Sequence, residues 1–107
     1  MASAGSADLP NAETCLGLLR AHQRDLEVRG PRTIGVFGSV ARNRTRTTSD
    51  IDVLVEFAAD SHHDLFDFAD LRDFLMRLFG REVDLVSRKA LLPGRDDDIL
   101  NGTLQAF

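Results

Sequence analysis

Two aspartates alternate at the start of a strand-forming segment and limit what this chain can fold into. Asp50 and Asp52 flank Ile51, and the run continues as Val53-Leu54-Val55. Since residues i and i+2 of a strand point to the same side, both carboxylates should face one side of it. Two like charges held that close repel each other unless a cation lies between them. Such oxygen ligands suit Mg²⁺, which is usually bound by a few carboxylates together with substrate phosphates.

A Gly38-Ser39 pair precedes the two aspartates. A glycine at this position would let the chain turn sharply and bring backbone N–H groups close to a phosphate. Ser39 would begin the next helix, and its hydroxyl can also donate to a phosphate oxygen. Each feature has a simpler explanation when taken alone. Gly38-Ser39 could form a plain strand-to-helix turn, and the two aspartates could lie by chance at a solvated strand end. Together they favour a phosphate and metal site.

A third carboxylate lies in the apolar segment Val83-Asp84-Leu85-Val86. A buried, unpaired charge there would be costly, and a partner cation would remove that cost. The alternative is that Asp84 lies on an edge strand or at the surface. Three carboxylates could hold two metal ions that clamp the attacking and leaving oxygens of an in-line phosphoryl displacement. The sequence therefore predicts Asp50, Asp52 and Asp84 as catalytic residues and metal ligands, with Asp84 accepting the proton of the attacking hydroxyl.

Helical and strand patterns alternate along the rest of the chain. Asn11 is expected to cap a helix with the apolar stripe Leu16, Leu19 and Leu26, which Gly30-Pro31 ends. Strands are expected over residues 32–37, 51–57 and 81–87. Between the last two, a long amphipathic helix is expected to be capped by Ser61 and to end at Gly80. Its expected buried stripe is Leu65, Phe68, Leu71, Leu75 and Leu78.

A last short helix is expected to begin at Asp96 or Asp97 and to run through Leu104. Alternating helices and strands predict an α/β fold, here a two-layer α+β domain. The expected sheet is small, three-stranded and mixed, with helices packed on one face. Residues 1–10 should form a flexible tail, and residues 11–107 one folded domain.

Composition excludes several other classes of protein. Hydrophobic residues make up 43% of the 107 and charged residues 28%, which is ordinary for a globular domain. A net charge of -4 argues against a general nucleic-acid binder. With Cys15 as the sole cysteine, no disulfide framework or thiolate zinc site is expected. The chain shows neither an apolar stretch of membrane-spanning length nor an export signal, so a cytoplasmic location is expected.

The combined motif resembles the polymerase-β-type nucleotidyltransferase superfamily. It consists of Gly38-Ser39-Val40-Ala41-Arg42, then Ser49-Asp50-Ile51-Asp52, then the lone later aspartate. The short length resembles the minimal members, the MNT proteins of bacteria and archaea, over residues 16–100. The resemblance implies that Gly38 and Ser39 hold the nucleotide phosphates and that the three aspartates bind Mg²⁺. Arg42 and Ser49, which belong to the same motif, are further candidate nucleotide ligands.

The resemblance also implies an activity and a partner. Many MNT proteins are antitoxins of a HEPN-domain ribonuclease, and some silence that toxin by transferring AMP from ATP to one of its tyrosines. The expectation is therefore a Mg²⁺-dependent antitoxin in a hetero-oligomeric complex, with no membrane or direct nucleic-acid partner. Two alternatives stay open. One is a non-catalytic antitoxin that inhibits by stoichiometric binding, and the other is a nucleotidyltransferase with a small-molecule acceptor.

The stretch Asn43-Arg44-Thr45-Arg46-Thr47-Thr48 departs from the family pattern, in which a glycine is followed by an acidic or small-residue loop. Asn43 follows Ala41-Arg42, where family members usually have glycine. Asparagine tolerates left-handed backbone angles better than most residues, so the turn is expected to be kept. Arg44 and Arg46 follow it and could reach a triphosphate, contact an acidic patch on a partner, or remain solvated loop charges.

Overall fold

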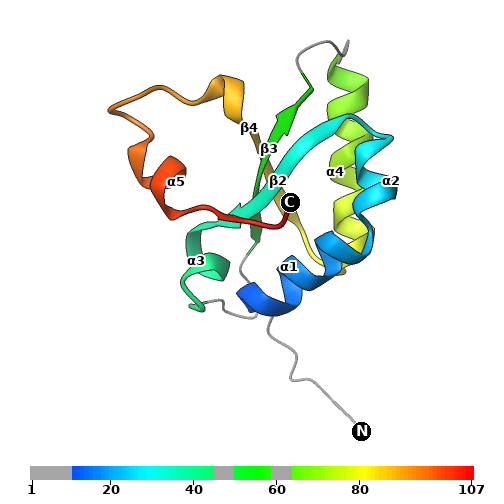
Figure 1. Cartoon of the computed structure of the whole chain (residues 1–107), viewed down its shortest axis with the longest axis horizontal. Helices are drawn as coiled ribbons and strands as arrows, with labels where there is room; N and C mark the ends of the chain where they lie inside the picture. The colour runs from blue at the N-terminus through cyan, green and yellow to red at the C-terminus, as the bar shows by residue number, and fades with distance from the viewer. Residues whose placement is uncertain (1–10, 45–49, 59–63) are drawn as a thin grey trace, which may run out of the picture.

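The computed structural model describes residues 11–44, 50–58 and 64–107, and these contain one sheet of four strands (Figure 1). Their order is β4-β3-β2-β5, and they are β2 Pro31–Phe37, β3 Ile51–Phe57, β4 Val83–Ser87 and β5 Leu104–Gln105. Strand β2 runs antiparallel to β3 and β5, whereas β3 and β4 are parallel. The predicted mixed α/β fold is confirmed, but the sheet has four strands rather than three.

Helices α1, α2 and α4 lie together on one side of the sheet, and α5 lies on the other side (Figure 1). The helices are α1 Ala12–Ala21, α2 Gln23–Glu27, α3 Gly38–Ala41, α4 Leu65–Phe79 and α5 Asp97–Gly102, with a 3₁₀ turn at Arg88–Ala90. Parallel strands need a crossover connection, and α4 provides it between β3 and β4. The three grouped helices therefore form the main layer, and most of the opposite sheet face stays open to α5 and solvent.

Alternation along the strands places the core between the sheet and this helical layer. On β3, the side chains of Ile51, Val53 and Val55 are fully buried. They pack in one cluster with residues of the neighbouring elements: Cys15, Leu19, Leu26, Ile34, Val36, Val40, Leu71, Leu75, Val83, Leu85 and Ala106. Cys15 is thus a core residue, and its burial raises the pKa of its thiol to about 11. On the opposite face of β3, Asp52 and Glu56 are partly exposed, and Leu54 is buried.

The first helical segment begins as predicted but is broken in the middle. The Asn11 side chain accepts a hydrogen bond from the Thr14 N–H at 2.8 Å, which is the expected cap. At His22 the chain leaves α1, and α2 begins at the next residue. The His22 ring Nδ1 donates to the Leu18 carbonyl oxygen at 3.0 Å. A side chain that bonds the backbone locally competes with helix continuation, so one expected helix becomes two.

The long helix α4 begins later than its apolar pattern suggests. Asp64 caps it in a reciprocal capping box with Asp67, whereas Ser61, the predicted cap, lies outside the described residues. Leu65 and Phe66 are 80% and 83% exposed, so the expected buried stripe is wrong at Leu65. Gly80 ends the helix in the left-handed conformation, as predicted.

The last strand explains why the expected helix through Leu104 is too long. Helix α5 ends at Gly102, and β5 then pairs with β2 through Gly35 and Val36. Gly35 has no side chain at the point where this segment crosses it. A Cβ there would overlap the Leu104 carbonyl oxygen and would lie 2.9 Å from Thr103 Cγ2. The missing side chain of Gly35 therefore allows the C-terminal segment to complete the sheet.

Gly35→Ala should destabilise the protein by about 1–3 kcal/mol, because the added methyl group overpacks a backbone contact. Gly17→Ala is the matched control, since a Cβ at this helical glycine meets nothing within 4 Å. That variant should be neutral or stabilising, by up to about 1 kcal/mol. Urea denaturation of both variants measures the difference, and equal effects would contradict this account of the C-terminal segment.

Candidate active site

The sheet register brings the sequence-predicted carboxylates to one end of the sheet. Asp52 on β3 lies directly opposite Asp84 on the parallel strand β4. Asp50 immediately precedes β3, two residues before Asp52, and on a strand this spacing places it on the same side. On the other side of β3, Phe37 is the register partner of Asp52, and Gly38 follows it directly. Two neighbouring strands and a turn thus converge on Asp52.

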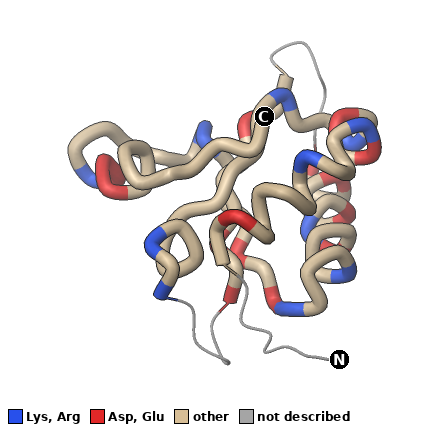
Figure 2. Tube along the Cα trace, turned by 60° about the horizontal axis from the view of Figure 1, so that its bottom comes forward, with Lys and Arg blue, Asp and Glu red and all other residues tan. Residues whose placement is uncertain are grey.

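Burial and like charges make Asp52 the electrostatic centre of this group. Burial raises the pKa of its carboxyl above the ordinary value, and the nearby charges of Asp84 and Asp50 raise it further. The Arg42 guanidinium acts in the opposite direction. Figure 2 shows the basic end of α3 on the same side of the molecule as the acidic start of β3. The predicted carboxylate cluster therefore exists as a set of interacting charges.

Gly38 lies directly against the Asp52 carboxylate. Its φ of +68° falls in the left-handed region, which glycine adopts at little cost. A Cβ at this position would overlap Asp52 Oδ2. Glycine is thus required here by the backbone and by the carboxylate, and Ser39 follows it in the first turn of α3.

The turn after α3 is a Schellman motif centred on Asn43. The Asn43 N–H donates to the Val40 carbonyl at 3.0 Å, and the Arg44 N–H donates to the Ser39 carbonyl at 2.8 Å. Asn43 has a φ of 55°, so the predicted left-handed turn is kept. Arg42 and Arg44 are exposed on either side of it. Ser49, Arg46 and the rest of residues 45–49 lie outside the described residues.

The prediction that Asp84 is a buried charge is wrong. Its side chain is exposed, and in the described part of the chain β4 is an edge strand, so Asp84 is not a buried charge. The alternative of a surface residue on an edge strand describes its environment correctly. Its position opposite Asp52 comes from strand register, which the composition of its own segment could not reveal.

The donor set of this cluster fits a hard cation in part. Within residues 11–44, 50–58 and 64–107, no three acidic, histidine or cysteine side chains are already arranged as a complete metal-ligand group. Mg²⁺ does not need such a cage, because it usually keeps several waters and takes one or two carboxylates plus substrate phosphates. A carboxyl whose pKa is raised by neighbouring carboxylates, as that of Asp52 is, is the kind of group that a cation stabilises in its charged form. The residues therefore fit Mg²⁺ brought together with a phosphate ligand.

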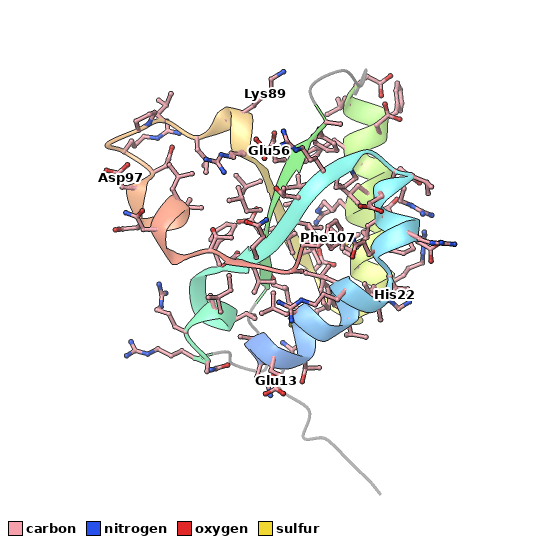
Figure 3. All side chains as sticks on the ribbon, in the orientation of Figure 1. Glu13, His22, Glu56, Lys89, Asp97 and Phe107 are labelled. Atoms are coloured by element: carbon pink, nitrogen blue, oxygen red, sulfur yellow. The ribbon has the colours of Figure 1, made fainter. Side chains whose placement is uncertain are left out.

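Glu56 lies on the open face too, but away from the carboxylates. Figure 3 shows it at the opposite end of the sheet from α3, and its Oε1 accepts a hydrogen bond from Thr33 Oγ1 at 3.4 Å. With Arg88 it lines a cavity of about 80 Å³ beneath the α5 segment. The cavity lies outside the carboxylate cluster and is not counted as part of the candidate site.

Comparison with known proteins identifies the family. The nucleotidyltransferase domain family matches residues 19–104. This chain belongs to that family. The Protein adenylyltransferase MntA of Thermococcus cleftensis is 41% identical over 78 residues, which cover 72% of this chain and 77% of that relative. The predicted membership of the nucleotidyltransferases is thus confirmed.

Solved structures agree with this family at the level of the fold. One identified as a minimal nucleotidyltransferase matches with a TM-score of 0.67 and 35% identity, and the match covers 83% of this chain and 93% of that one. A tri-AMPylated Shewanella oneidensis HEPN toxin in complex with MNT antitoxin matches with a TM-score of 0.60, 20% identity, and coverages of 86% and 71%. At that identity the second match shows the fold alone. Within the described residues, no helix is long and apolar enough to cross a membrane.

Gly38→Ala should damage the site more than its backbone strain alone explains. Gly80→Ala is the matched control, since Gly80 has a φ of +66° and a Cβ there meets nothing within 4 Å. A non-glycine residue in the left-handed region costs about 1–2 kcal/mol, and both variants should lose that much stability. Only Gly38→Ala should also displace the Asp52 carboxylate and abolish nucleotide binding. Calorimetric titration with ATP and Mg²⁺ separates the two, and retained binding by Gly38→Ala would contradict the contact.

Asp52→Asn should stabilise the metal-free protein at neutral pH. The pKa of Asp52 is raised in the folded state, so its contribution to stability is full below the ordinary aspartate pKa. That contribution is lost as pH rises through the raised folded value, and the ionised group then opposes folding. Removing the charge should therefore raise the thermal midpoint at pH 7, and the gain should shrink as pH falls toward 4.

Thermal melts in EDTA measure this difference, with Asp25→Asn, an exposed aspartate of α2, as the control. A lower midpoint for Asp52→Asn at pH 7 would show that the Asp52 charge is not under repulsion.

Proposed function

We propose that this chain is the antitoxin of a HEPN-domain ribonuclease toxin. It neutralises the toxin by transferring AMP from ATP to a hydroxyl group of that toxin, which we assign to a tyrosine. The observation that carries the proposal is the meeting of Gly38, Asp52 and Asp84 at one end of the sheet. The similarity to the Thermococcus protein adenylyltransferase MntA supports the choice of AMP. The shared fold of the Shewanella antitoxin in its toxin complex supports the choice of partner.

Asp50, Asp52 and Asp84 are the proposed metal ligands and catalytic residues. Asp50 and Asp52 would hold the metal that accompanies the donor triphosphate, because Asp50 immediately precedes β3 and Asp52 lies beside the Gly38 turn. Asp84, across from Asp52 on β4, would bind the metal on the side where the acceptor hydroxyl enters the site. Bound there, two Mg²⁺ ions would neutralise the triphosphate charge and lower the pKa of the acceptor hydroxyl.

The proposed reaction is an in-line displacement at the α-phosphorus of ATP. A bond forms from the acceptor hydroxyl oxygen to the α-phosphorus, and the bond from that phosphorus to the oxygen bridging to the β-phosphorus breaks. Pyrophosphate leaves with that oxygen, and the hydroxyl proton passes to the Asp84 carboxylate. An exposed Asp84 suits this role, since a protein acceptor must reach it from solvent.

Gly38, Ser39, Arg42 and Ser49 are the proposed nucleotide ligands. The close approach of Gly38 to Asp52 would let a phosphate touch the turn and a carboxylate-bound metal at once. Ser39 can donate its hydroxyl to a phosphate oxygen. Arg42 is exposed and lies one helical turn from Gly38, to whose carbonyl its N–H donates at 3.2 Å, so its guanidinium is proposed to contact the same phosphate. Ser49 is carried by the motif alone.

We assign the catalytic unit to residues 11–107 and its action to the cytoplasm, where ATP and the RNA substrates of a ribonuclease are available. Exposed apolar side chains support a protein partner. Val28, Leu65 and Phe66 are each at least 80% exposed, and large apolar groups on a surface commonly mark contacts with other proteins.

The test is the intact mass of the proposed partner, a HEPN-domain toxin from the same organism, after co-expression with this protein. Wild type should add the mass of one or more AMP groups, because its carboxylate cluster is complete. The Asp50→Asn/Asp52→Asn variant should add no AMP. Losing one group that stabilises charge in the transition state commonly lowers the rate by about 10²–10³-fold. Chelation of Mg²⁺ in a purified reaction should give the same loss.

Co-purification of the toxin is measured in the same experiment as its mass, since the double variant should still bind the toxin. An unmodified toxin that co-purifies with wild type would contradict catalysis and favour inhibition by stoichiometric binding. A toxin that neither binds nor gains mass would leave a small-molecule acceptor as the better account.

A further inference from the structure

Asn43 makes a long-range hydrogen bond that the proposed chemistry does not use. Its Oδ1 accepts from the Ala12 N–H at 3.0 Å, although the two residues are 31 apart in sequence. Ala12 is the first residue of α1, and the first N–H groups of a helix have no partner within the helix. One side chain therefore joins the turn after α3 to the start of α1.

This bond ties the turn to a part of the molecule that is firmly packed. Ala12, Cys15 and Leu19 of α1 are buried, and Cys15 and Leu19 belong to the core cluster. Helix α3 has only four residues, and Val40 anchors it in the core. The Asn43 side chain adds a second connection, from the turn that follows α3 to the start of α1.

The same residue also sets the direction of the two flanking arginines. Its backbone has a φ of 55° and occupies the left-handed position of the Schellman motif, so it reverses the chain between Arg42 and Arg44. The Arg42 N–H donates to the Gly38 carbonyl at 3.2 Å, and Gly38 lies against the Asp52 carboxylate, so the backbone of Arg42 is held one helical turn from the site. Glycine could supply the backbone angle without the side-chain bond, so the two roles of Asn43 are separable by substitution.

We propose that Asn43 is a positioning residue for nucleotide binding, because it locks the α3 turn and Arg42 to the start of α1. It touches neither the carboxylates nor the acceptor, and it acts through Arg42. The inference rests on the proposed function, in which Arg42 contacts the triphosphate of the donor.

The decisive variant is Asn43→Gly, which keeps the left-handed backbone and removes only the side-chain acceptor. One intramolecular hydrogen bond is worth about 0.5–1.5 kcal/mol, so the Kd for ATP with Mg²⁺ should rise about two- to tenfold. In the AMP-transfer assay, KM for ATP should rise with it, and kcat at saturating ATP should stay close to wild type.

Asn11→Ala is the matched control. Asn11 caps the same end of the same helix, and within the described residues its hydrogen bonds, from the N–H groups of Thr14 and Cys15, stay in that helix. Losing this cap should lower the melting temperature by about as much as losing the Asn43 bond does. If Asn43 only stabilises α1, both variants will lower the melting temperature and neither will change the Kd for ATP.

A double variant tests the route through Arg42. Arg42→Ala should weaken ATP binding by itself, and adding Asn43→Gly should then have little further effect, since the group being positioned is gone. Additive losses would overturn this route.

The outcomes separate this inference from the proposed function. If wild type binds ATP and Asn43→Gly binds it equally well, the positioning role is wrong and the transferase assignment stands. If wild type binds no ATP at all, the assignment of the donor is wrong, and the inference fails with it.

Discussion

The two-residue period of β3 is the constraint on which the rest of the structure depends. Its odd-numbered residues Ile51, Val53 and Val55 are fully buried against the helices, whereas on the other face Leu54 is buried and Asp52 and Glu56 stay partly exposed. Because the period of a strand is two, a slip of one residue would turn the carboxylate of Asp52 into the core. The burial of three aliphatic side chains therefore also fixes the direction of the site. The same strand register therefore places the core on one face of β3 and the candidate active site on the other.

That register concentrates like charges, and the rest of the fold must tolerate the cost. Asp52 stands opposite Asp84, with Asp50 two residues away, and the three carboxylates repel one another. Each fully buried aliphatic side chain contributes about 1.5–3 kcal/mol, so the core beneath easily outweighs the repulsion of partly solvated charges. A site under repulsion of this kind is suited to bind cations and phosphates, and its cost in stability is typical of functional sites.

Contacts distant in sequence hold the edges of the site. At one end, Asn43 joins the α3 turn to α1. At the other edge of the sheet, β5 pairs with β2, and the Arg20 Nε donates to the Ala106 carbonyl at 2.8 Å. Helix α1 therefore contacts both the turn that carries Arg42 and the C-terminal segment. A helix with no residue in the carboxylate cluster thus supports the elements around it.

Local patterns in the sequence were enough for much of this protein. The alternation of β3, the left-handed turn at Asn43, the Asn11 cap and the end of α4 at Gly80 all follow from preferences of single residues or short segments. The motif residues indicated the nucleotidyltransferase family, and the comparison with known proteins confirmed it. These features are decided within a few residues of chain, so the sequence determines them by itself.

Tertiary structure decided the features that depend on which strands meet. A two-residue strand such as β5 has too little pattern to be seen alone, and it exists because Gly35 leaves room for it. The exposure of Asp84 follows from the place of β4 at the end of the sheet order. Its position opposite Asp52 follows from the register of a parallel pair separated by a whole helix. Register and edge position are properties of the assembled sheet, and no single segment of the sequence contains them.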